Sequence, residues 1–533
     1  MIYDPLEDYE KRLKETHLNA TNVFFEGLIK QSNVNIEENR NTVNQYNIYK
    51  DNLVKLKRKM ALLQVLRVFM CISIILIPVV ILKTNPKIKE LREDIEHADN
   101  KSEELLAQAY NQMLPLNGLF TDRDALNLIQ QTTPLISFDP CFSIEKELDM
   151  QINYDLDSDI SAEESTLDIL SGSYNGNPFF FENRVIHTMG TATYHGYKTI
   201  HWTETYKDSS GQTRTVSRSE TLQATVVKPK PYFNTQVVLN YGAQAGPELE
   251  FSRDASHYEQ KNSKQIDKIV KRGERTLKKK SDDAIKHNKS FTSMSNTRFE
   301  VLFGALDRTN EVQFRELFTP LAQTNMVDLI LSKTGYGDDF NFRKRRRMNE
   351  IVSEHSQGRV MNLVPKDYTS YSFDIIRDNF VNKNVEFFKA VYFDFAPLLA
   401  IPAYQDRPVH SLEPIPDYSQ KYSIKESETL ANAVDTQYVV HPDTKTRAII
   451  KSSFVKSVGD VDETCITAYS YDIEQRVDIV SVKGGDGHYH DVSVPWDEYI
   501  PLEEQNTFHI GKYENKQEKS VYAIKNGLCI YKK

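Results

Sequence analysis

Residues 191–226 read TATYHGYKTIHWTETYKDSSGQTRTVSRSETLQATV, and this stretch decides the fold class. Both of its halves are rich in Thr, Tyr, Val and Ile with a period-two alternation, which is typical of β-strands. Between the halves, residues 207–211 (KDSSG) have the composition of a glycine-containing turn. The stretch therefore predicts a long antiparallel hairpin, with a further strand after the KPKP sequence at residues 228–231.

The remainder of the chain mixes helical and strand-like segments. Residues 483–487 (KGGDG) lie between strand-like stretches and predict a second hairpin in the last part of the chain. Residues 257–290 and 310–331 have helical patterns, and residues 299–303 are expected to form an apolar strand. These patterns predict an α+β protein with at least two antiparallel sheets.

Length and composition are those of a folded protein. The chain has 533 residues, and at about 150 residues per domain this length allows three or four domains. Hydrophobic residues make up 39% and charged residues 26%, which excludes a disordered or collagen-like chain. The net charge of −9, from 66 basic and 75 acidic residues, argues against a protein that coats nucleic acid.

One apolar run interrupts this polar sequence. Residues 68–82 (VFMCISIILIPVVIL) carry no charge, and the apolar character extends back to Ala61 across Arg67. As a helix, residues 61–82 would be about 33 Å long, enough for a hydrocarbon layer of about 30 Å. A cleaved signal peptide is disfavoured because sixty highly charged residues precede the run, whereas a buried core helix is the remaining alternative. We expect a single transmembrane helix at residues 61–83, and hence a single-pass protein of the cell membrane.

The flanks of this run bear on its orientation. Five basic residues precede it closely and four follow it, a difference that decides little by itself. The N-terminal tail carries 10 basic and 9 acidic residues and would be hard to translocate, so we expect a cytoplasmic N-terminus and an extracytoplasmic C-terminal body. Of the four cysteines, Cys71 lies in the run and no CxxC is present, so no disulfide framework or zinc ribbon is indicated.

Helices are expected on both sides of the run. Residues 1–60 predict two helices with a break around residues 31–35. Residues 84–116 predict a coiled-coil stalk because apolar side chains recur with 3-4 spacing from Ile88 to Leu105. Its partner would be another copy of the chain or the chain's own later helices. Residues 87–170 hold 6 basic and 19 acidic residues, a local net charge of −13.

Two basic segments are candidates for anion binding. Residues 343–347 (RKRRR) form a run of five cations, and residues 261–289 hold 11 basic and 4 acidic residues along an amphipathic helix. Such segments suit an anionic lipid surface or a phosphate-bearing partner. The alternative is a solvated face, or pairing with the acidic region at residues 87–170. The candidate anion-binding residues are Lys278, Lys279, Lys280, Arg343, Lys344, Arg345, Arg346 and Arg347.

Other candidate sites are isolated motifs. Residues 336–339 (YGDD) match the metal-binding hairpin of RNA-dependent polymerases, but the flanking strands and a second aspartate motif are missing, so a turn is favoured. His488 and His490 alternate after a glycine-rich turn and share a strand face, so with Asp491 or Asp486 they could bind one metal ion. Neither a phosphate-binding loop, nor a GxSxG elbow, nor an HExxH motif is present. The sequence nominates no catalytic residue and no cofactor.

Five stretches, which cover about a third of the chain, carry a family resemblance: residues 191–233, 248–253 (ELEFSR), 310–342, 393–405 (FDFAPLLAIPAYQ) and 427–451. Together they resemble an uncharacterised membrane-protein family of mollicutes and related low-GC Gram-positive bacteria. The resemblance implies a bacterial membrane protein and brings no known activity, ligand or catalytic residue.

These observations favour a non-enzymatic, membrane-anchored scaffold or interaction protein. Its expected partners are the lipid bilayer and, through its helical regions, a protein partner or a second copy of the chain. Nucleic acid is disfavoured as a partner. The alternatives are a membrane-tethered enzyme with the His488 and His490 metal site, or a lipid- or nucleic-acid-binding module that uses the basic segments. The expected domains are an N-terminal helical region (1–60), the transmembrane helix (61–83), the stalk (84–116), a β-rich domain (117–256), a basic helix (257–292), an α/β segment (293–410) and a strand-rich region (411–533).

Overall fold

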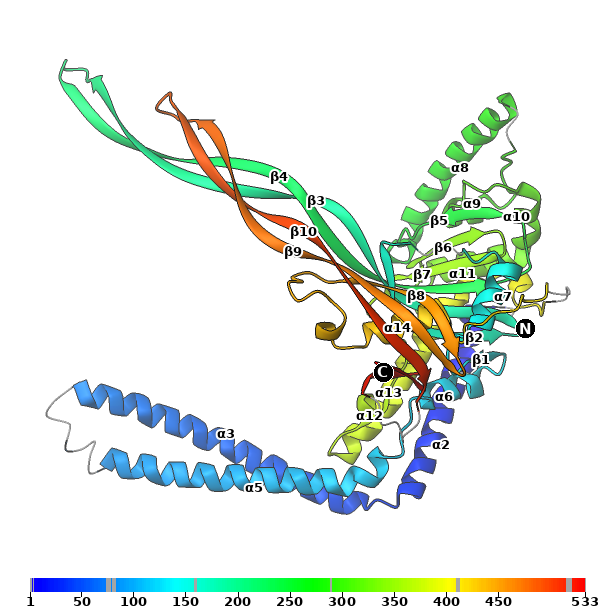
Figure 1. Ribbon diagram of the computed structural model, residues 1–533, viewed down its shortest axis with the longest axis horizontal. Coiled ribbons are helices and arrows are strands. Elements are labelled where there is room, and N and C mark those ends of the chain that lie inside the picture. Colours follow the sequence, from blue (N-terminus) through cyan, green and yellow to red (C-terminus); the bar gives the residue numbers. More distant parts are fainter. Residues whose placement is uncertain are drawn as a thin grey trace. The chain divides into compact units, whose positions relative to one another are not determined.

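A computed structural model describes residues 2, 4–72, 78, 83–157, 161–287, 290–408, 413–513 and 520–532 (Figure 1). The chain forms two compact units. The first, which we call the body, comprises Met1–Leu6, Ser137–Met361 and Asp394–Lys533. The second, which we call the helical unit, comprises Glu7–Ile136 and Asn362–Phe393.

The body is built on a seven-stranded sheet with the strand order β1-β2-β3-β4-β7-β6-β5. The pairs from β2 to β5 are all antiparallel. The predicted α+β class with antiparallel sheets is therefore confirmed. The strands are β1 (Ile136–Phe138), β2 (Glu164–Tyr174), β3 (Asn177–Lys207), β4 (Thr213–Gly242), β5 (Glu250–Arg253), β6 (Phe340–Arg345) and β7 (Met348–Ser353).

The two faces of this sheet differ in chemistry because side chains alternate along each strand. On one face, the rings of Phe179 and Phe181 meet Phe395 edge-on at 4.9 and 5.6 Å between centroids. The other face carries Phe180, Glu182 and Arg184, of which only Phe180 joins a buried apolar cluster. One face of the sheet is thus an aromatic core, and the other is largely polar.

A second, five-stranded sheet has the order β11-β12-β10-β9-β8. Its longest strands form the hairpin predicted around residues 483–487, and β3 with β4 forms the hairpin predicted at residues 191–226; both predictions are confirmed. The predicted separate strand after the KPKP sequence is wrong, because β4 continues through Pro229 and Pro231. The strands are β8 (Ile449–Val458), β9 (Val461–Lys483), β10 (Tyr489–Lys512), β11 (Val521–Lys525) and β12 (Leu528–Tyr531).

Helices of the body cover the seven-stranded sheet. The strand expected at residues 299–303 is instead a helix, in which Asn296 caps the Phe299 N–H and Phe299, Leu302 and Phe303 are buried at helical spacing. The helix expected at residues 310–331 is two helices, because Pro320 starts a new one. The body helices are α7 (Ile144–Tyr154), α8 (Ser263–Lys286), α9 (Thr297–Phe303), α10 (Glu311–Leu317), α11 (Pro320–Leu331) and α14 (Ile424–Asn432).

The helical unit contains a pair of long antiparallel helices, α3 and α5, which lie side by side (Figure 1). Near one end Gln112 donates to the Thr42 hydroxyl at 3.1 Å, and further along Lys57 and Asp99 form an ion pair of 3.7 Å. The predicted break around residues 31–35 is confirmed, since α2 ends at Ser32. The helices are α2 (Lys14–Ser32), α3 (Ile36–Ile72), α5 (Asn85–Asn117), α6 (Asp124–Thr132) and α12 (Pro365–Tyr368), with much of α13 (Phe373–Leu399).

The predicted membrane span is contradicted. Among the described residues, no helix combines the length and the apolar character that crossing a bilayer requires. The described start of the span, from Ala61, is the last part of α3, a helix that carries many charged side chains along its length. Residues 73–77 and 79–82 of the expected span lie outside the described residues. The transmembrane helix and the single-pass localisation are therefore withdrawn.

The predicted coiled-coil stalk is also wrong. Residues 84–116 do form a helix, α5, but its long helical neighbour is α3 of the same chain, neither another copy nor a later helix. The physical reason is the pairing of the two legs of a helical hairpin, which buries apolar side chains of α5 such as Ala98, Leu105 and Met113. Self-association through the helical regions stays a prediction.

Candidate functional site

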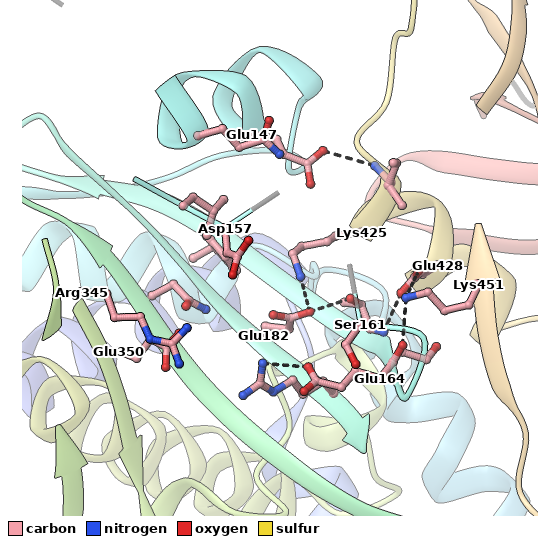
Figure 2. A pocket seen from close by; sticks show the side chains of 18 of the residues that line it. Glu147, Asp157, Ser161, Glu164, Glu182, Arg345, Glu350, Lys425, Glu428 and Lys451 are labelled. Carbon is pink, nitrogen blue, oxygen red and sulfur yellow. Dashed lines mark hydrogen bonds and ion pairs between the residues drawn. The ribbon is translucent and has the colours of Figure 1, made fainter. Parts of the chain in front are cut away.

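A cavity of about 300 Å³ lies on the polar face of the seven-stranded sheet. Its floor is formed by alternate side chains of neighbouring strands. Helices α7 and α14 and strand β8 supply the other walls, so segments far apart in the sequence meet there (Figure 2). The floor residues are Glu182 and Arg184 of β3, Asn240 of β4, Glu350 of β7, and Arg343 and Arg345 of β6.

One ion pair of the cavity joins Lys425 to Glu182 at 2.7 Å. The Thr166 hydroxyl also donates to Glu182, at 2.6 Å. Burial alone would raise the pKa of Glu182, but Lys425 and Thr166 outweigh burial and hold this pKa below its ordinary value. Likewise, burial would lower the pKa of Lys425, but the neighbouring carboxylates outweigh it and raise this pKa. Both groups are therefore charged at neutral pH.

Two further ion pairs line the inner part of the cavity. Lys451 lies 2.7 Å from Glu428, and Arg184 lies 2.9 Å from Glu164. Burial raises the pKa of Glu428, an effect that Lys451 opposes. Figure 2 shows the lysine and glutamate side chains of α14, β3 and β8 pointing toward one another across the cavity wall. The inner cations of the cavity thus already have carboxylate partners.

Glu147 of α7 differs from these carboxylates. Among the described residues, Glu147 accepts one hydrogen bond, from the backbone N–H of Ile424 at 3.4 Å. Burial raises the pKa of Glu147 to about 7, although Lys425 opposes this shift. A carboxyl group with this pKa is partly protonated near neutral pH, so it can both donate and accept a hydrogen bond.

The local sequence explains how charged side chains come to lie in this cavity. In α7, Ile144, Glu147, Met150 and Tyr154 recur at helical spacing and are all buried, with Ser143 capping the first turn. Glu147 therefore occupies a position at which the pattern of buried residues in α7 predicts an apolar side chain. A charged residue on the buried stripe of a helix is the signal that could have identified this site from the sequence.

The cationic run at residues 343–347 lies in the hairpin of β6 and β7. Because strand side chains alternate, Arg343 and Arg345 face the cavity whereas Lys344 enters the opposite, buried face. There the Lys344 amine donates to the carbonyl of Ala245 at 2.9 Å, and burial lowers its pKa to about 7. Arg346 and Arg347 form ion pairs with Asp155 at 3.9 and 3.2 Å.

The basic helix α8 packs against α9 of the body. Ile266, Val270, Leu277 and Ala284 form its buried stripe. Lys278 and Lys279 are exposed, whereas Lys280 donates to the Leu306 carbonyl and its amine lies 4.5 Å from the centroid of the Phe291 ring. Of the predicted anion-binding residues, only Lys278 and Lys279 on α8 and Arg343 and Arg345 at the cavity are both exposed and without an ion-pair partner among the described residues.

The candidate metal ligands lie at the turn between β9 and β10. His490 meets Asp486 at 2.9 Å, whereas Asp491 accepts a hydrogen bond from Ser481. His488 is exposed, and Asp491 follows His490 directly, so the two side chains lie on opposite strand faces. In the described parts of the chain, no three His, Cys, Asp or Glu side chains are grouped as a metal site requires.

The YGDD sequence forms part of the body's core. Asp338 is fully buried, pairs with Arg253 and accepts the Ser256 N–H at 3.0 Å. Asp339 accepts a hydrogen bond from His355 at 2.6 Å. Asp338 and Asp339 lie between α11 and β6, and both carboxylates have protein partners. This agrees with a structural turn and not with a polymerase metal site.

Two paired ribbons form a second candidate surface. The first arm is residues 188–232 of the β3–β4 hairpin, and the second arm is residues 472–500 of the β9–β10 hairpin. In these ranges each strand pairs only with its hairpin partner within the described chain. Figure 1 shows the two arms running side by side away from the sheets of the body.

The arms contact each other through a small apolar cluster: Ile200, Leu222 and Ala224 of the first arm against Val492 and Val494 of the second. Gly196 allows the close approach, because a Cβ there would lie 2.2 Å from the carbonyl oxygen of Ser493.

Charge supports the same pairing of the arms. The first arm carries six basic and three acidic residues, whereas the second carries two basic and seven acidic residues. An ion pair of 2.7 Å joins Lys228 of the first arm to Asp478 of the second. The backbone N–H of Gly485 donates to Glu220 at 2.6 Å. The two arms are thus complementary in charge as well as in shape.

Comparison with protein-family models, curated proteins and solved structures finds no match for this chain. The resemblance to the mollicute family therefore stays a prediction, and the functional argument rests on the geometry above.

Proposed function

We propose that the protein is a non-catalytic interaction protein and that the two arms bind a protein partner with an apolar surface. The observation that carries the proposal is the set of large apolar side chains exposed along the arms. Ile479 and Tyr489 of the second arm are 68% and 72% exposed, and Tyr197 and Val227 of the first arm are also exposed. The strand register places Ile479 and Tyr489 on one face of the second arm and Tyr197 and Val227 on one face of the first. Apolar side chains exposed on a shared face are characteristic of interaction sites.

The architecture of the arms supports this reading. A two-stranded ribbon is marginally stable in water, because it orders many residues while burying little apolar surface. Here two such ribbons stabilise each other through the Ile200–Val492 cluster, yet their other faces stay uncovered in the described chain. A projecting surface with few internal contacts is better suited to binding than to supporting the body.

The faces of the arms, rather than the edges of β4 and β10, are the surface for the partner. Pro229 and Pro231 interrupt the backbone donors of β4, and Pro495 and Pro501 do the same in β10. A strand that added to these edges would lose hydrogen bonds at each proline, and prolines commonly protect open edges in this way. The aromatic and aliphatic side chains therefore supply the contact.

The test places a photo-crosslinking amino acid at Tyr489 in the full-length protein inside its cells. The matched control is Val312 of α10, which is 66% exposed but lies outside the arms. The polypeptide crosslinked at Tyr489 is then purified and its affinity for the protein measured. We expect Ile479→Asp to weaken binding at least tenfold, and Val312→Asp to leave it unchanged. Equal crosslinking at both positions, or an affinity that Ile479→Asp does not change, contradicts the proposal.

A second candidate function rests on α8. Its buried stripe faces α9, whereas Lys278 and Lys279 are exposed and form no ion pair with any described residue. This face fits a polyanionic partner. Binding of the full-length protein to heparin should weaken steeply with salt and fall in Lys278→Gln/Lys279→Gln; binding that the double substitution leaves intact contradicts it.

A further inference from the structure

The rim of the cavity on the polar sheet face carries two guanidinium groups without an acidic partner. Arg343 and Arg345 are exposed, lie two residues apart on β6 and share the face that lines the cavity. Within the described residues no carboxylate forms an ion pair with either of them. Glu350 lies opposite Arg343 in the β6–β7 register but forms no ion pair with it. The neighbouring Arg347, by contrast, pairs with Asp155.

A buried amide lies next to this rim. Asn240 of β4 is only 5% exposed, and it lines the cavity beside Glu350 in the strand register. No described residue forms a hydrogen bond with its side chain. The amide atoms of Asn240 are not among the enclosed unpaired polar atoms of the described residues, so they open into the cavity, where such a group meets water or a ligand. The amide of Asn240 thus offers two donors and one acceptor to the cavity.

The inner wall is different, because its charges are already balanced. Lys425 and Lys451 have their partners in Glu182 and Glu428, and Arg184 pairs with Glu164. An incoming anion would have to break one of these ion pairs to bind deep in the cavity. The two cations without an ion-pair partner among the described residues, Arg343 and Arg345, lie at the rim, where Asp157 and Glu350 also line the cavity. The anionic group of a ligand therefore belongs against the two guanidinium groups.

We propose that this cavity binds a small organic oxyanion, whose anionic group lies against Arg343 and Arg345 and whose neutral polar part reaches Asn240 and Glu147. Guanidinium groups present paired N–H donors that match the oxygens of a carboxylate or phosphate. A volume of about 300 Å³ holds a small molecule and no polymer segment. The site is additional to the partner-binding surface proposed for the arms, and neither depends on the other.

The test is isothermal titration calorimetry on the full-length protein at fixed ionic strength. The probes are inorganic phosphate, succinate and the diamine putrescine. We expect saturable binding of phosphate or succinate at one site, and the probe that binds more tightly identifies the ligand as a phosphate ester or a carboxylate. Putrescine should not bind. Arg343→Gln/Arg345→Gln should weaken anion binding at least tenfold, and Asn240→Asp, which brings a negative charge to the cavity, should abolish it.

The matched control is Lys278→Gln/Lys279→Gln, which removes two exposed cations of the same unit away from the cavity. This variant should bind the anion as tightly as the unchanged protein. Because Arg343 and Arg345 are exposed, their substitution should leave the far-ultraviolet circular dichroism spectrum unchanged. The proposal is overturned by the absence of saturable anion binding, by an equal loss in the control variant, or by tighter binding of putrescine than of either anion.

Discussion

Replacing Lys425 with methionine tests the charge network of the cavity most directly. The substitution keeps the length of the aliphatic chain but removes the ammonium group that lies 2.7 Å from Glu182. Glu182 is 3% exposed, so hydration from the cavity can recover only part of the lost interaction. The folded variant must therefore either hold an unpaired buried charge or protonate Glu182.

The expected magnitude follows from this burial. Removing one partner of a buried ion pair costs about 3 to 5 kcal/mol. Glu182 keeps the hydrogen bond from Thr166, so we expect the lower end, about 3 kcal/mol, or roughly a hundredfold in the unfolding equilibrium. In the unchanged protein the pKa of Glu182 is depressed, so its ionised form stabilises the fold at neutral pH. Without Lys425 the pKa rises, and the loss of stability should shrink as pH falls and Glu182 takes up a proton.

The assay is urea unfolding followed by far-ultraviolet circular dichroism between pH 5 and pH 8. Tryptophan fluorescence is unsuitable, because Trp202 and Trp496 both lie on the arms. Lys445→Met is the matched control, since Lys445 forms a pair of similar length, 2.8 Å, with Asp472 at an exposed site. Its unfolding midpoint should not change measurably.

The double variant Lys425→Met/Glu182→Gln should recover much of the loss, because no buried charge is left unpaired. The reasoning is refuted if Lys425→Met costs less than about 1 kcal/mol at pH 7, well below the range for buried pairs. It is equally refuted if the loss is independent of pH, or if the double variant is no more stable than the single one.

Two further predictions concern Glu147 and the contact between the arms. Burial raises the pKa of Glu147 from 4.5 to about 7, so the folded state holds this proton more tightly than the unfolded state does. Stability should fall by roughly 3 kcal/mol as pH rises from 4.5 to 7, and Glu147→Gln should remove this slope from the urea midpoints; an identical slope in both proteins excludes the assignment. Gly196→Val should separate the arms, because even a Cβ at this position meets the Ser493 carbonyl, and the emission of Trp202, which lies beside Gly485, should shift to the red. Unchanged emission would show that the arms tolerate the larger side chain.

Local pattern was sufficient for the long elements. Period-two alternation around glycine-containing turns identified both hairpins, and the spacing of apolar residues identified α8 and the break between α2 and α3. The prediction for residues 61–82 was wrong because the hydropathy of a window does not register that α3 reaches this run from charged residues and pairs with α5. The strand predicted at residues 299–303 was wrong for a related reason: an apolar run of that length fits a strand or a buried helix equally well.

No sequence pattern predicted the cavity. The sequence shows that residues 343–347 are a cationic run, but it does not show the directions of their side chains. Those directions depend on the β6–β7 pairing, which makes the side chains alternate across a strand. Glu147, Lys425 and Glu428 carried no recognisable motif. The one indication of a site in the sequence is the charged Glu147 on the buried stripe of α7. The residues that contact each other in the cavity come from segments up to about 280 residues apart.

The sequence by itself determined the local periodicities, and these specified the class of the fold and the two long hairpins, because hydrogen-bonded turns and alternating side chains depend on near neighbours. Tertiary structure alone decided the rest: which face of the central sheet is aromatic and which is polar, which cations have partners, and which arginines are free. Those properties depend on contacts between segments distant in the chain, where burial and the proximity of opposite charges set the energy of every ionised group.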